Sequence, residues 1–204
     1  MPDFLSLAGI FGNHIRNRPS ESACMHRNHL LEQVEEYRTR SPDEIETVDR
    51  FLEFVRREKA CFDRQTLEGH VTGSAWVEST DGDAVLLLLH RKLGRWLQPG
   101  GHADGDNDVL NVARREAFEE TGLVHLLADP KIFDLDIHQI PARGSEPAHL
   151  HYDLRYRMSA AAGQTAAISP ESLDLKWYPM VDVAGWDRQP SISRMAIKSL
   201  GLGH

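Results

Sequence analysis

The chain has 204 residues, of which 41% are hydrophobic, and this is enough for one sizeable core with additional elements around it. Its formal net charge is −8 and it contains no run rich in Lys or Arg, so a nucleic-acid duplex is excluded as an expected partner. Two cysteines, Cys24 and Cys61, make no disulfide framework, and no apolar run approaches the ~20 residues of a membrane span. We therefore expect a cytoplasmic protein with no membrane partner.

The N-terminal region is expected to contain two helices. Residues 1–24 lack the basic start of a signal peptide, and we expect them to be disordered or an artefact of start assignment, with Met25 as the alternative start. Apolar residues follow helical spacing from Asn28 to Arg40. The sequence Ser41-Pro42-Asp43-Glu44 has the pattern of a capping box. It predicts a second helix that runs to about Lys59, with an apolar stripe made of Ile45, Val48, Leu52 and Val55.

This helical extension, residues 25–68, precedes the part of the chain that carries the candidate site. We expect the extension to pack on a sheet. The alternatives are a dimer element, which would make the protein a homodimer, or a wall of the active site.

Strand patterns begin near His70 and define an α/β region over residues 69–204. Val71–Ser79 and Ala84–Arg91 flank Thr80-Asp81-Gly82-Asp83, which is a good hairpin turn. Later segments predict three further strands and a closing helix: Lys131–Ile140, His149–Ser159 and Leu173–Val181, then Ser191–Leu200. Helices on both sides of a mixed sheet are the economical arrangement of these elements.

One further helix is expected from Asp108 to Thr121, after the pair Gly100-Gly101. Asp106, Asn107 and Asp108 provide N-cap chemistry, and Gly122 stands where a left-handed residue ends a helix. The apolar residues recur at helical spacing: Val109, Val112, Ala113, Ala117 and Phe118.

Three carboxylates of this helix share one face, because Glu116, Glu119 and Glu120 stand at i, i+3 and i+4. They lie in its last turns, where the helix dipole disfavours anions. A hard divalent cation such as Mg²⁺ removes this conflict, since it prefers carboxylate oxygens. The alternative from the charge pattern alone is a solvated acidic helix face.

The segment from Gly101 to Leu123 resembles the signature of the Nudix (MutT-like) hydrolases, G-x5-E-x7-R-E-U-x-E-E-x-G-U, in which U is apolar. The matching residues are Gly101, Arg115, Glu116, Ala117, Glu119, Glu120, Gly122 and Leu123. Asn107 replaces the first Glu of the signature, at a position that the resemblance implies is structural or peripheral to the metals. The resemblance covers about Gly69 to Leu200 and implies an α/β/α sandwich with the box as a loop–helix–loop.

The same resemblance implies a role for each box residue. Glu119 and Glu120 would be direct ligands of Mg²⁺ or Mn²⁺, and Glu116 would be a third ligand or would orient the attacking water. Arg115 would hold a box carboxylate in place, and the carbonyl of Gly100 would complete the coordination of a metal.

The activity implied is pyrophosphohydrolase activity: metal-dependent hydrolysis of a diphosphate linkage in a nucleoside diphosphate derivative or a nucleoside triphosphate. The partner would then be a small molecule of the nucleotide type. A Nudix domain that senses a nucleotide without hydrolysing it is the alternative, but intact box carboxylates favour the enzyme.

His149 and His151 are further candidates, because they alternate with Asp153 along an expected strand and so share a face. We expect them to contact substrate phosphates, and the alternatives are a structural polar face or a metal site. Glu171 would come from a loop to the metal centre, as in many Nudix enzymes, or lie on the surface.

His102 and His70 form a separate hypothesis. Their positions resemble those in isopentenyl diphosphate isomerase, a Nudix-fold enzyme with a histidine-bearing metal site. That family has a cysteine where this chain has Gly100, which argues against isomerase chemistry. His102 is therefore kept as a substrate-binding candidate, and its use or that of His70 at a metal site stays open.

Overall fold

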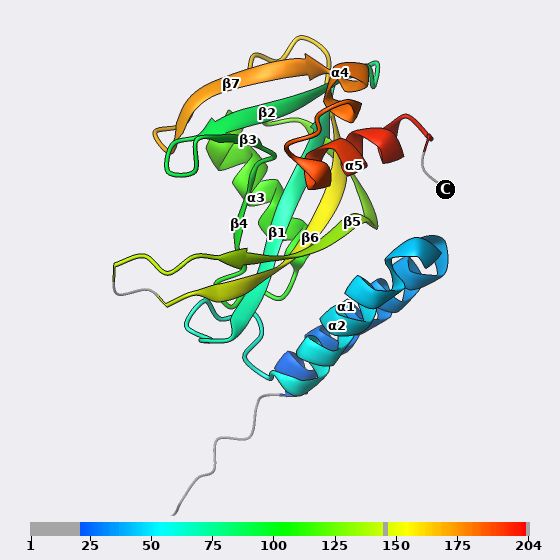
Figure 1. Ribbon diagram of the computed structural model, residues 1–204, viewed down its shortest axis with the longest axis vertical. Coiled ribbons are helices and arrows are strands. Elements are labelled where there is room, and N and C mark those ends of the chain that lie inside the picture. Colours follow the sequence, from blue (N-terminus) through cyan, green and yellow to red (C-terminus); the bar gives the residue numbers. More distant parts are fainter. Residues whose placement is uncertain (1–20, 145–146, 203–204) are drawn as a thin grey trace, which may run out of the picture.

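The computed structural model describes residues 21–144 and 147–202, with side chains from residue 27 onward (Figure 1). The helices are α1 (Glu21–Arg40), the short 3-10 helix η1 (Pro42–Glu44), α2 (Ile45–Arg57), α3 (Val109–Thr121), α4 (Met180–Ala184) and α5 (Pro190–Ser199). The strands are β1 (Gly69–Glu78), β2 (Ala84–His90), β3 (Arg95–Leu97), β4 (Gly100–His102), β5 (Leu126–Ile140), β6 (His149–Ala160) and β7 (Ser172–Pro179). Most of the expected segment 1–24 lies outside the described residues, and residues 21–24 form the start of α1.

The described strands form one mixed sheet in the order β3-β2-β1-β6-β5, with β4 paired to β1 and β7 paired to β2. β1 and β6 run parallel along their whole length, and the other pairs are antiparallel. The first half of β1 pairs with β4 and its end pairs with β2. β1 is therefore the central strand of the sheet. Its antiparallel pairing with β2 is the hairpin that the sequence predicts.

Helices cover both faces of the sheet, which confirms the predicted α/β sandwich (Figure 1). On one face, α3 packs with α1 and α2 over β1, β5 and β6 in a single apolar core that includes Val71, Leu154 and Tyr156. On the opposite face, α4 and α5 pack over Trp76, Val85 and Leu87. β1 contributes Trp76, in its second half, to this cluster. Helices α4 and α5 therefore cover the second half of β1 on this face and leave its first half uncovered.

The N-terminal helices pack against the sheet through aromatic side chains. Phe54 stacks on Tyr152 of β6 with ring centroids 3.7 Å apart, and Phe51 meets the same ring edge-on at 5.5 Å. Val48, Leu52 and Val55 are buried as predicted, but Ile45 is 42% exposed. The apolar core of α1 and α2 is thus continuous with that of the sheet, which supports the packing interpretation.

Two local predictions are wrong. The capping box does not form, because the side chain of Ser41 makes no capping hydrogen bond and Glu44 instead accepts a hydrogen bond from Tyr37 Oη at 2.5 Å. Tertiary contacts therefore outcompete the local cap. The last expected strand also ends earlier, and Val181 lies in α4 with its side chain exposed. Among the described residues, no helix is long and apolar enough to cross a lipid bilayer.

Candidate active site

Helix α3 carries the candidate carboxylates and its ends are fixed locally. Asp108 is the N-cap residue and its side chain accepts a hydrogen bond from the backbone N–H of Asn111 at 3.0 Å. Gly122 ends the helix in the left-handed region with φ +68°. Four of the residues predicted to form the apolar stripe are buried: Val109, Val112, Ala113 and Ala117. The prediction is wrong for Phe118, whose side chain is 53% exposed.

The glycine pair before α3 lets the backbone of β4 approach the box carboxylates. Gly100 N–H donates to Glu120 Oε2 at 2.9 Å. A Cβ at Gly101 would lie 2.5 Å from the carboxyl carbon of Glu116, so a side chain at this position would displace the carboxylate. The sheet and the helix are therefore clamped together at the point where Glu116 and Glu120 meet the Gly100-Gly101 backbone.

The pKa values of these carboxyls are raised. Burial raises the pKa of Glu120 to about 7, the hydrogen bond from Gly100 opposes the shift, and the charges of Glu116 and Glu171 add to it. Burial also raises the pKa of Glu116, against the effect of Arg115 and with that of Glu119 and Glu171. Carboxylates crowded in a half-buried site are the donor set that a hard divalent cation fits.

Arg115 and Glu171 both act on the box carboxylates, the first by a hydrogen bond and the second through its charge. Arg115 Nη2 donates to Glu116 Oε1 at 3.0 Å and to the backbone carbonyl of His102 at 3.1 Å. Glu171 precedes β7 and its backbone carbonyl accepts from Arg91, while its charge acts on both Glu116 and Glu120. Glu119 is exposed on the same helix face. Glu116, Glu119 and Glu120 thus share one helix face, and the charge of Glu171 reaches the first and last of them.

Gly100 itself has no room for a side chain. A Cβ built there would lie 2.2 Å from Ser74 Oγ and 3.0 Å from the Cα of Ser74. The close packing of β4 on β1 explains the glycine, and it argues against the isomerase alternative, which would need a cysteine at this position.

A model of the NUDIX domain family matches residues 69–196, well over half of the chain. The chain belongs to the NUDIX family. The match includes the whole segment from Gly101 to Leu123 that resembles the Nudix signature.

The chain is also similar in fold to solved structures. The chain is 19% identical to an Ap4A hydrolase of C. elegans solved as a binary complex, with a TM-score of 0.50, over 64% of this chain and 97% of that one. It is 24% identical to a NUDIX-family hydrolase of Clostridium perfringens, with a TM-score of 0.48, over 66% and 98% of the two chains. These similarities concern the fold. No protein among the curated sequences matched the chain.

The Nudix sheet carries a group of histidines on the face opposite α3. The cross-strand register places His70 of β1 beside His151 of β6, and His151 beside His138 of β5. The distance between ring centroids is 4.9 Å for His70 and His102, and also 4.9 Å for His70 and His151. The structure therefore brings together His70, His102 and His151, a contact between the two separate histidine hypotheses that the sequence did not predict.

Burial and the neighbouring imidazoles lower the pKa values of two of these rings. Burial is the main cause for His70, whose pKa falls to about 4 with the charges of His102 and His149 adding to the shift. Burial also lowers the pKa of His151 well below its ordinary value, helped by His138 and His102. Both rings are thus neutral near pH 7, which disfavours the expectation that His151 binds phosphate as an imidazolium.

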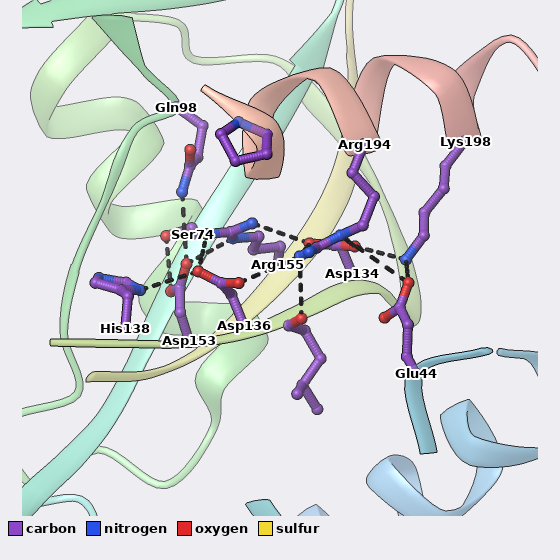
Figure 2. A network of polar contacts seen from close by, with 12 residues as sticks. Glu44, Ser74, Gln98, Asp134, Asp136, His138, Asp153, Arg155, Arg194 and Lys198 are labelled. Atoms are coloured by element: carbon purple, nitrogen blue, oxygen red, sulfur yellow. Dashed lines mark hydrogen bonds and ion pairs between the residues drawn. The ribbon is translucent and has the colours of Figure 1, made fainter. Parts of the chain in front are cut away.

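Asp153 does not line a cleft beside these histidines, although it lies on the same sheet face. It is buried, and it accepts hydrogen bonds from Thr72 and Ser74 at 2.8 Å each and from Arg155 at 2.8 Å. Figure 2 shows Asp153 pointing into a network of charged groups rather than toward solvent. Asp153 therefore belongs to the hydrogen-bond network within the sheet, and the functional expectation for His149 and His151 stays a prediction.

Sequence reasoning missed His138 and the network around Arg155. Asp134, Asp136 and His138 alternate along β5 and so share a face, which the period of two in the sequence reveals. His138 Nδ1 lies 3.2 Å from Asp136 Oδ2, and Arg155 bridges Asp134 and Asp136 (Figure 2). The alternation was available in the sequence, but the pairing of β5 with β6 was not.

Proposed function

We propose that this Nudix hydrolase uses Mg²⁺ or Mn²⁺ to hydrolyse a diphosphate linkage in a nucleoside diphosphate derivative or a nucleoside triphosphate. The observation that carries the proposal is the pair Glu116 and Glu120, half-buried against the Gly100-Gly101 backbone with raised pKa values. Carboxylates held this close together need a cation to share the charge.

The residues that would hold the metal are Glu116, Glu119 and Glu120, with the carbonyl of Gly100. A bound divalent cation supplies charge stabilisation for the phosphate oxygens and a more acidic water. The protein's own part is orientation. Arg115 fixes Glu116 by a hydrogen bond, and the backbone of Gly100 fixes Glu120, so each carboxylate is held before substrate arrives.

Glu171 is the further candidate for this centre. Its charge raises the pKa values of both Glu116 and Glu120, so it lies within electrostatic reach of the cluster. It also stands on a loop before β7, where an exposed carboxylate is free to face an incoming substrate. We propose that Glu171 orients the attacking water or completes the metal site once substrate is bound.

The test is the substitution Glu120→Gln, which keeps the shape of the side chain and removes its charge. We expect kcat to fall by at least ~10²-fold, as for the loss of one main electrostatic stabiliser. Glu53→Gln is the matched control, because the Glu53 side chain is 73% exposed on α2, in the N-terminal extension. Unchanged phosphate release by a folded Glu120→Gln protein would overturn the proposal.

The substrate is best sought with a panel. Phosphate or pyrophosphate release would be measured with Mg²⁺ over nucleoside triphosphates, dinucleoside polyphosphates and nucleoside diphosphate sugars. We expect turnover of at least one member of the panel that disappears when a chelator removes the metal. Tight binding of a nucleotide by the wild-type protein without any turnover would instead indicate a sensing domain.

A further inference from the structure

The side chain of His70 is buried, and its ring makes no well-formed hydrogen bond. It is only 1% exposed, and neither Nδ1 nor Nε2 has a partner of good hydrogen-bond geometry among the described residues. The backbone of Thr66 lies near enough to oppose the fall in the pKa of the ring, but not in the geometry of a hydrogen bond. A buried polar group without a partner costs free energy, so such a group needs an explanation. Binding a metal ion is one common use of an imidazole nitrogen, and it requires further donor atoms close by.

Other imidazoles surround His70. His102 of β4 and His151 of β6 each offer a ring nitrogen, and one such atom from each of the three residues lies within 4.8 Å of the others. The ring centroids of His102 and His151 are 5.0 Å apart. The strands β1, β4 and β6 thus each place one nitrogen donor at the same point, on the sheet face opposite α3.

His149 lies beside this group. A hydrogen bond from its Nδ1 determines that the lone pair of the ring is on Nε2. Its Nδ1 lies 2.9 Å from the carbonyl oxygen of Pro147, and because a carbonyl only accepts, Nδ1 carries the proton. Its Nε2 lies 3.3 Å from Nε2 of His151, the distance of a hydrogen bond between the two rings. His149 is not among the three residues whose nitrogens lie within 4.8 Å of one another, so it flanks the group without belonging to it.

We propose that His70, His102 and His151 bind a transition-metal ion of the zinc class, with solvent as the remaining ligand and the ring of His149 beside that of His151. The donor set decides the class of metal: imidazole suits zinc, cobalt and nickel, whereas Mg²⁺ requires oxygen ligands. The neutral state of His70 and His151 near pH 7 leaves their lone pairs available for the metal. His102 and His151 are partly exposed, which gives an ion a route from solvent.

This site is separate from the box carboxylates. Successive residues of a strand point to opposite faces, and a Cβ at Gly101 would point at Glu116 on the α3 side. The next residue, His102, therefore points to the other face of β4, where His70 lies. Two metals of different chemistry would then stand on opposite sides of one strand.

The experiment uses Co²⁺ as a spectroscopic probe on the full chain, stripped of metal by a chelator and kept in excess Mg²⁺. We expect one equivalent of Co²⁺ to produce the visible absorption bands of a four-coordinate nitrogen site. His70→Asn and His102→Asn should each weaken this binding by at least about 10-fold. His125→Asn is the matched control, since His125 is exposed and its hydrogen bonds with Gln164 run through its backbone.

The Glu120→Gln variant separates this proposal from the proposed function. It should lose phosphate release and still give the Co²⁺ bands with unchanged affinity. The proposal is overturned if the folded wild-type protein gives no such bands, or if both histidine variants keep them. Loss of the bands in Glu120→Gln would also overturn it, because the ion would then belong to the carboxylates. If His70→Asn does not fold, the half-buried His102→Asn alone carries the comparison.

Discussion

At the scale of single residues, Glu120 is a carboxyl group whose ionised form is disfavoured in the folded protein. It lies half-buried among other acids, and a single backbone N–H from Gly100 compensates in part. Burial and neighbouring charges raise its pKa to about 7, above the 4.5 of an ordinary glutamate. Such a shift is typical of sites where charge is arranged for function rather than for stability.

Glu120→Gln is therefore expected to stabilise the metal-free protein at pH 8, by roughly 2–4 °C in Tm or about 1 kcal/mol. Between about pH 4.5 and 7 the folded carboxyl keeps a proton that the unfolded chain has lost, so wild-type stability falls as pH rises through this window. The difference in Tm between wild type and variant should thus disappear below about pH 4.5. Thermal melts across this range check it, and a Tm difference independent of pH would show that ionisation of Glu120 is not its cause.

At the scale of elements, α3 is defined by short-range chemistry at its ends. Asp108 caps the first turn, and Asp106 supports it by accepting hydrogen bonds from the N–H of Asp108 and from the side chain of Asn111. Asn107, which replaces the first glutamate of the Nudix signature, is not the N-cap residue. The departure from the signature therefore falls beside the cap and before the first turn of the helix.

Asp108→Ala should lower the free energy of unfolding by about 1 kcal/mol, because the N–H of Asn111 loses its partner. Asn107→Glu is the neighbouring comparison, and we expect it to change both stability and hydrolysis little. Urea denaturation and a Mg²⁺ titration of activity measure the two effects. A large gain in Mg²⁺ affinity in Asn107→Glu would show that position 107 does serve the metal.

At the scale of the whole molecule, a buried ionic network joins the sheet to the terminal helices (Figure 2). Arg155 of β6 pairs with Asp134, Asp136 and Asp153, and its side chain is only 3% exposed. Lys198 of α5 continues the network, since its Nζ lies 2.5 Å from both Asp134 and Glu44. The contact with Glu44 joins the N-terminal extension to the C-terminal helix beside Asp134 of β5, the last strand in the sheet order.

Arg155→Met should destabilise the protein by about 3–5 kcal/mol, because it leaves buried carboxylates without their cation. The matched control is Arg56→Ala, which removes an exposed pair with Glu35 and should cost less than about 1 kcal/mol. Chemical denaturation of both variants gives the comparison. Equal, small losses in the two variants would show that the network contributes little to stability.

The sequence by itself determined α3, its ends, the carboxylate face and five of the strands, but it did not predict the short strands β3 and β4. These features depend on residues within a few positions of one another, where helical spacing, caps and turn residues act directly. The same local rules failed at Ser41 and Phe118, because partners distant in sequence decide whether a side chain caps, packs or stays exposed.

Only the tertiary structure decided which polar residues of the strands meet. His70 and His151 are 81 positions apart, and their contact depends on the parallel register of β1 with β6, which leaves no mark in either strand alone. The same register sends Asp153 into the ionic network instead of a cleft. A strand's sequence fixes which residues share a face, but the pairing of strands fixes what that face touches.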